Sequence, residues 1–264
     1  MKTTEKVEED KKQVSNILRE KLLEQVENLP VFELRDIAME KDEKWKRQEH
    51  LKAITEIEDD IITAIVSDKY KLVQFKEVFI PTIEQIGDIS RGSVLHYKGK
   101  AEIVLVPEES KIGLSIRNSV DGNGAVWIRF CAITDNLTVY LPRGIKGVEG
   151  VKKIHVEGVK KTISDITTTL MRVRETWETI VEKFSTYVLG EEEVTQALKD
   201  IKAGKRISKK ISAVTASKNI SLWHLLIEVV KAISKRKYKN EIKKAEKIER
   251  ICNLIYRYSV ALNI

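Results

Sequence analysis

One long stretch in the second half of the chain repeats apolar residues at alternating steps of three and four. Its nine members are Val156, Val159, Ile163, Ile166, Leu170, Val173, Trp177, Ile180 and Phe184. This 3.5-residue period predicts a long helix with one narrow apolar seam. Such a seam must pack against another helix to be shielded from solvent. The partner is either a helix of the same chain, giving a compact monomer, or another chain. The second alternative predicts interface contacts through the eight members from Val159 to Phe184, and a homo-oligomer if the other chain is a second copy.

The composition limits where such a chain can work. Hydrophobic residues make up 42% of the 264 residues, enough to bury one large core or two modest ones. The longest apolar runs are far shorter than the roughly 20 residues of a membrane span, so we expect a cytoplasmic protein without a membrane partner. Charged residues reach 33%, and Lys and Glu dominate, which favours a hyperthermophilic source. Cys131 and Cys252 occupy positions suited to small apolar residues and are expected to be buried free thiols.

The N-terminal region, residues 1–66, is expected to consist of helices. Residues 5–28 alternate charged and apolar residues and stop near Pro30, which disfavours helix at the residue before it. A second helical stretch is predicted from Glu33 to Val66, although its middle is mostly charged.

The remaining chain predicts an α+β fold, in which a small antiparallel sheet is flanked by the N-terminal helices and a long-helix C-terminal part. Residues 67–150 are expected to contain one helix, near 75–86, followed by the sheet, because short β-branched runs alternate there with turn residues. Residues 151–264 are expected to be helical and to form one domain with the sheet. The predicted strands are 93–97, 101–106, 112–116, 126–133 and 137–141.

Positive charge is concentrated in one part of the chain. The formal net charge is +7, whereas residues 202–250 contain fifteen Lys or Arg against four Glu and carry +11. Such a region is typical of polyanion binding, because cations that neutralise phosphates release counterions. The alternative is that these lysines coat solvated helix faces and helix C-termini. The predicted nucleic-acid-binding residues, with Tyr238 stacking on a base, are Lys205, Arg206, Lys209, Lys210, Lys235, Arg236, Lys237, Tyr238, Lys239, Lys243 and Lys244.

Motifs for catalysis, cofactors or metals do not occur in the sequence. The four histidines never share the spacing of a metal site, and His224 beside Trp223 is expected in a helix core. The segment Asn118–Gly124 lacks the Lys and Ser or Thr of a phosphate-binding loop and predicts a tight turn between strands. We therefore expect no catalytic, cofactor-binding or metal-binding residues, although carboxylates assembled across strands would leave no motif.

Several landmarks occur in one order along the middle of the chain. The run Ala64–Gln74 reads AIVSDKYKLVQ, and Asn118–Val126 reads NSVDGNGAV. With Asn136-Leu137, the passage Gly147–Thr162 and Ser221-Leu222-Trp223, they resemble the phage/plasmid-like protein family, domain of unknown function 932. The resemblance covers roughly residues 64–235. It implies residence on a phage, plasmid or similar element and brings no established activity.

Two functions from different classes follow. The first is a non-enzymatic, sequence-nonspecific DNA- or RNA-binding protein of an archaeal virus or plasmid, because lysine contacts to phosphate position a protein without reading sequence. The alternative is a structural or assembly protein, a virion or oligomeric scaffold component, that uses the 156–184 seam for subunit contacts. The first function requires the cations to gather on one surface, and acidic side chains among them would remove its basis.

Overall fold

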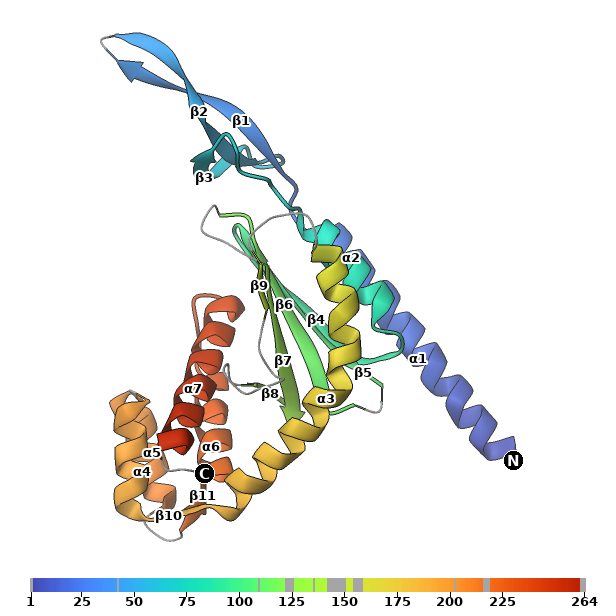
Figure 1. Cartoon of the computed structure of the whole chain (residues 1–264), viewed down its shortest axis with the longest axis vertical. Coiled ribbons are helices and arrows are strands. Elements are labelled where there is room, and N and C mark those ends of the chain that lie inside the picture. The colour runs from blue at the N-terminus through green and yellow to red at the C-terminus, as the bar shows by residue number, and fades with distance from the viewer. Residues whose placement is uncertain are drawn as a thin grey trace. The chain divides into compact units, whose positions relative to one another are not determined.

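The computed structural model confirms an α+β fold of helices and antiparallel sheets (Figure 1). The chain divides into two compact units. Unit 1 comprises residues 1–128 and 150–168, and unit 2 comprises residues 129–149 and 169–264. The division passes through strand β7 (Val126–Thr134) and helix α3 (Val159–Thr186). The structure describes residues 2–41, 43–108, 110–121, 126–134, 136–141, 151–153, 159–201, 203–215 and 219–261.

The predicted strands of the central region are confirmed, with ends that differ by a few residues. Neighbouring strands pair antiparallel in chain order, and β9 (Val151–Lys153) pairs with β7. Gly113 lies where β5 and β6 approach closely, because a methyl group there would come within 2.4 Å of the Leu105 carbonyl oxygen. The strands in chain order are β4 (Ile89–Tyr97), β5 (Lys100–Pro107), β6 (Ile112–Ser119), β7 and β8 (Leu137–Tyr140).

Two helices pack on the sheet within unit 1, and both were predicted. Helix α1 (Lys2–Glu27) lies against β4, and α2 (Phe75–Gln85) lies against β5 and β6. Leu22 and Val26 of α1 are 1% and 0% exposed, so this face of the helix is desolvated. The N–H of Ile89 donates to Ser15 Oγ at 2.8 Å, which ties the middle of α1 to the start of β4.

The predicted helix from Glu33 to Val66 is wrong, because this segment is an antiparallel three-stranded sheet. Beyond β3 the first two strands continue as a two-stranded ribbon (Figure 1). Most side chains of Lys44–His50 are exposed on both faces of that ribbon, so the sequence shows no period of two there. Its Glu and Lys residues are also good helix formers, which produced the wrong prediction. The strands are β1 (Phe32–Lys41), β2 (Lys44–Glu56) and β3 (Ile61–Ser67).

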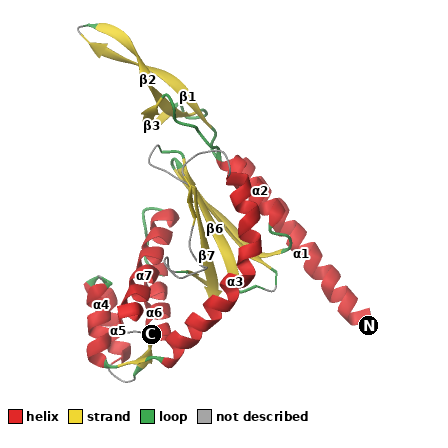
Figure 2. Ribbon diagram, in the orientation of Figure 1, coloured by secondary structure: helices red, strands yellow, loops and turns green. Residues whose placement is uncertain are grey.

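Unit 2 is mainly helical (Figure 2), as predicted for the C-terminal part. Ser221 caps α6 by accepting a hydrogen bond from the His224 N–H at 3.2 Å. The His224 side chain is exposed, so its predicted core position is wrong. The elements are the C-terminal part of α3, β10 (Val188–Leu189), α4 (Glu191–Asp200), α5 (Lys205–Thr215), β11 (Ile220–Ser221), α6 (Leu222–Ser234) and α7 (Glu241–Ala261).

The C-terminal half of the apolar seam is part of the chain's own core. Val173, Trp177, Ile180 and Phe184 are each at most 8% exposed in the single chain. Trp177 meets Trp223 of α6 edge to face, with 5.5 Å between ring centroids. The predicted interface is therefore corrected for these four residues, because side chains already buried in unit 2 are not available to a second chain. The side chains of the other four interface candidates, Val159, Ile163, Ile166 and Leu170, lie outside the described part of the chain.

Both cysteines are buried free thiols, as predicted. Burial raises the pKa of the Cys252 thiol to about 12, because a thiolate is poorly stabilised in an apolar core. Among the described helices, none combines the length and the apolar character needed to cross a bilayer.

Candidate nucleic-acid interface

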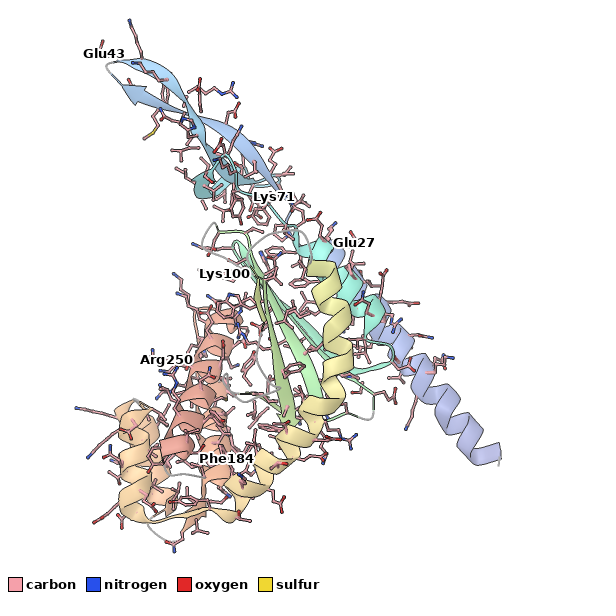
Figure 3. The ribbon with its side chains drawn as sticks, in the orientation of Figure 1. Glu27, Glu43, Lys71, Lys100, Phe184 and Arg250 are labelled. Carbon is pink, nitrogen blue, oxygen red and sulfur yellow. The ribbon has the colours of Figure 1, made fainter. Side chains whose placement is uncertain are left out.

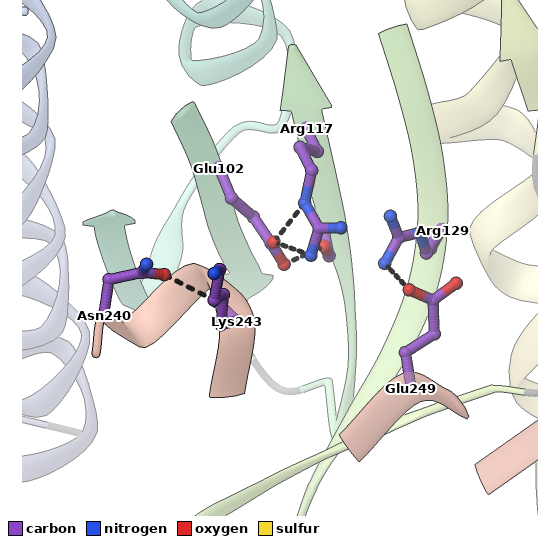
Figure 4. Close-up of polar contacts among 7 residues, drawn as sticks. Glu102, Arg117, Arg129, Asn240, Lys243 and Glu249 are labelled. Atoms are coloured by element: carbon purple, nitrogen blue, oxygen red, sulfur yellow. Dashed lines mark hydrogen bonds and ion pairs between the residues drawn. The ribbon is translucent and has the colours of Figure 1, made fainter. Parts of the chain in front are cut away.

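The connection between α6 and α7 is short, cationic and held at both ends. At the end of α6 the N–H of Arg236 donates to the Ile233 carbonyl at 3.0 Å. At the start of α7, Asn240 Oδ1 accepts from the Lys243 N–H at 2.7 Å (Figure 4), an N-cap that satisfies a free helix donor. Between these points Lys235, Arg236, Lys237 and Lys239 are exposed, and Tyr238 is half-buried.

A second row of cations lies on one face of α7. Lys243, Lys247 and Arg250 are spaced by four and then three residues, which places them on adjacent turns of the same side of a helix. Lys243 and Arg250 are exposed and Lys247 is half-buried; Figure 3 marks Arg250 on α7. Lys247 and Arg250 were not among the residues predicted from the sequence. Their helical spacing from Lys243 could have indicated that they share its face.

A buried ion pair fixes which face of α7 turns inward. Glu249 accepts a hydrogen bond from Arg129 Nη1 (Figure 4), and both residues are under 10% exposed. The Arg129 guanidinium also lies 5.7 Å from the centroid of the Tyr140 ring. Separating such a pair leaves a desolvated charge, which costs several kcal/mol, roughly 3 to 5. Helix α7 is therefore held with Glu249 inside and the row of cations outside.

The α6–α7 connection reaches the start of α5 through Arg236. The Arg236 guanidinium lies over Gly204, since its Nη1 would be 4.0 Å from a methyl group at that glycine. Lys205, the first residue of α5, follows directly. Burial lowers the pKa of Lys247, and the positive charges of Arg250 and Arg236 lower it further.

We call this group the cationic surface of unit 2. It contains predicted residues from α5, the α6–α7 connection and α7, together with two residues that sequence reasoning missed. Lys209 lies one turn beyond Lys205 on α5 and is also exposed. The members are Lys205, Lys209, Lys235, Arg236, Lys237, Lys239, Lys243, Lys247 and Arg250.

Acidic side chains neutralise little of this surface. Lys244, a predicted site residue, pairs with Glu241 at 3.0 Å and is left out for that reason. Glu249 is buried against Arg129, and Glu246 is half-buried. Among the residues that the structure describes, no member of the cationic surface forms an ion pair.

Other predicted positions add nothing to the site. The side chains of Arg206 and Lys210 lie outside the described part of the chain. In the predicted glycine turn, residues 122–125 are likewise outside it, while Asn118 Nδ2 donates to the Val73 carbonyl at 3.0 Å and so supports β6 from the segment before α2. Within the described ranges, no three His, Cys, Asp or Glu side chains lie close enough to hold a metal ion.

Comparison with protein-family models, with curated proteins and with solved structures gives no match for this chain. The resemblance of residues 64–235 to the phage/plasmid-like family therefore stays a prediction, and the site must be interpreted from its own geometry.

Proposed function

We propose that this chain is a non-enzymatic, sequence-nonspecific nucleic-acid-binding protein that holds the phosphate backbone on the cationic surface of unit 2. The observation that carries the proposal is a set of exposed or half-buried cations on the α6–α7 connection and on one face of α7, none of which forms an ion pair among the described residues. Like charges repel one another, so a protein that gathers them gains when a polyanion binds between them.

The chemistry of the surface favours phosphate over base recognition. Its members are Lys and Arg, whose contacts to phosphate oxygens position a protein on a duplex or a single strand without reading sequence. Tyr238 is half-buried, so its ring has limited area for stacking on a base. We further propose, from the family resemblance and the composition, that the protein belongs to an archaeal virus or plasmid and acts in the host cytoplasm.

Salt dependence tests the proposal. We expect binding of a fluorescent oligonucleotide with a Kd of about 1 to 100 μM near physiological salt, the range of nonspecific complexes. The logarithm of the affinity should fall linearly with the logarithm of the salt concentration, by about 0.9 per phosphate neutralised on duplex DNA. Changing Lys247→Gln and Arg250→Gln together should lower that slope by up to about 1.8, and neutralising Lys235, Arg236, Lys237 and Lys239 should lower it further.

A matched control removes the same charge elsewhere in unit 2. Lys183 on α3 and Lys199 on α4 are exposed and lie outside the cationic surface, so Lys183→Gln with Lys199→Gln should leave the slope unchanged. Equal slopes for the α7 pair and the control pair would reject the surface, and no binding by the unaltered protein at low salt would reject the function.

A further inference from the structure

Strand β3 has a free edge that carries no charge. It pairs with β2 on one side, and no strand pairs with its other side within the described residues. Its sequence, IITAIVS, contains no Lys, Glu or Pro, the residues that usually protect edge strands from pairing with other chains. Ile61, Ile62 and Ile65 are 54%, 59% and 60% exposed. An exposed row of isoleucines on a free edge is a template for another strand.

The regular part of this edge begins after a bulge. Ala64 pairs with Ile54 of β2 and Ile62 pairs with Thr55, so Thr63 is the extra residue. From Ala64 to Ser67 the side chains alternate, with Val66 buried at 8% on one face and Ile65 exposed on the other. Antiparallel pairing requires facing side chains to share a face, which restricts the registers that another strand can adopt.

The residues on either side of β3 have opposite charge. Glu58 and Asp59 precede it and are exposed, while Asp60 is already paired with Arg35. Lys69 and Lys71 follow it and are also exposed. An antiparallel copy of the same segment would bring the acidic end of one strand beside the basic end of the other, twice, about a two-fold axis.

We propose that β3 pairs with β3 of a second copy of this chain, antiparallel and with Ile65 on the two-fold axis. Ala64 then faces Val66 of the second copy, and the basic end of each strand lies beside the acidic end of the other. In this register Ile65 packs against Ile65 of the second copy, and Val66 stays on the buried face of its sheet. The two three-stranded sheets become one six-stranded sheet. The charge complementarity of the segment with itself is what selects a second copy, since nucleic acid would meet Glu58 and Asp59.

Cross-linking tests the register. Directly facing residues of an antiparallel pair have Cβ atoms about 4.5 to 5.5 Å apart, so Ile65→Cys should yield a disulfide-linked dimer on mild oxidation with diamide. Ile62→Cys is similarly exposed but lies away from the two-fold axis, so the same residue of the second copy is out of reach and it should cross-link far less. The native cysteines are buried and serve as an internal control. Equal cross-linking of the two variants would overturn the register.

Sedimentation velocity of the full chain tests the partner. We expect a monomer–dimer equilibrium that Ile65→Lys abolishes and that Ile17→Lys, on an equally exposed isoleucine of α1, does not. Lys69→Glu with Lys71→Glu should weaken the dimer, as should Glu58→Lys with Asp59→Lys, and combining all four changes should restore it.

Three outcomes would overturn the proposal. They are a monomer at all concentrations, equal effects of Ile65→Lys and Ile17→Lys, and no recovery in the fourfold variant. If the chain is a monomer and Ile65→Lys instead weakens oligonucleotide binding, the edge of β3 binds nucleic acid rather than a second copy. None of these results depends on the cationic surface, so the two proposals succeed or fail separately.

Discussion

Replacing Leu22 of α1 by Ala tests how firmly this helix is docked on the sheet of unit 1. The Leu22 side chain is 1% exposed, and its Cδ1 lies 2.5 Å from the position that a methyl group on Gly92 would occupy. Leu22→Ala removes three buried carbons, worth about 2.4 kcal/mol at about 0.8 kcal/mol each. A rigid cavity would raise the loss toward about 5 kcal/mol. We expect the lower part of this range, about 2.5 to 3 kcal/mol, because an open groove already adjoins the site.

The groove has a volume of ≈ 160 Å³ and lets neighbouring side chains relax into the space that Leu22 leaves. It is lined by Leu18, Lys21, Leu22, Gln25, Gly92, Ser93 and Val94. Because a methyl group on Gly92 would enter the same space, Gly92→Ala should destabilise the native protein and partly rescue Leu22→Ala. The coupling in the double variant should exceed about 0.5 kcal/mol, the usual limit of additivity for separate sites.

Urea unfolding of the full chain gives these free energies, and hydrogen exchange of peptides from α1 and β4 shows that the loss arises in unit 1. Ile17→Ala on the same helix is the control, since Ile17 is 59% exposed and its loss should stay within about 0.5 kcal/mol. If Leu22→Ala costs no more than Ile17→Ala, or if the double variant is additive, the docking of α1 on β4 through Leu22 and Gly92 is refuted.

Two further predictions concern unit 2. The pKa of Lys247 lies below the ordinary lysine value of 10.5, so its ammonium loses its proton at a lower pH than an ordinary lysine does. Oligonucleotide affinity should therefore begin to decline at a lower pH than a site of ordinary lysines would show. Lys247→Arg keeps its charge and should hold the affinity at alkaline pH; identical anisotropy profiles for the two proteins would contradict the placement of Lys247 in the site. Since Cys131 and Cys252 are buried, and the pKa of Cys252 is about 12, neither thiol should react with a colorimetric disulfide reagent at pH 8 until denaturant unfolds the unit. Rapid reaction in the native state would show that α7 does not remain packed.

The parts of the fold that could be predicted are those in which at least one face of an element is buried. The strands from β4 to β8 carry β-branched residues between clear turn signals, and the helices of unit 2 have apolar faces with caps such as Ser221. The segment from Glu33 to Val66 failed because its ribbon is exposed on both faces, so solvation rather than packing sets its composition. Register in such a ribbon comes from backbone pairing, which the sequence does not display.

The candidate site was predicted in composition but not in arrangement. The excess of positive charge between residues 202 and 250 is visible in the sequence, and most members of the cationic surface follow from it. What the sequence does not show is that the Arg236 side chain reaches Gly204 or that Glu249 turns inward to Arg129. These contacts decide which cations share a surface, and they depend on tertiary packing. Lys244 illustrates the opposite case, since its pairing with Glu241 removes a predicted member.

The two proposed contacts lie on different units and use opposite chemistry. In the described part of unit 2, exposed cations lie without an ion-pair partner, whereas β3 in unit 1 exposes an uncharged edge with acidic and basic residues at its two ends. A dimer formed through β3 would hold two cationic surfaces in one particle. Joining two weak sites in this way can raise the affinity for a polymer long enough to reach both by about 10² to 10⁴, without any new contact. A modest, sequence-independent affinity of each unit 2 would then be sufficient for stable coating of a nucleic acid.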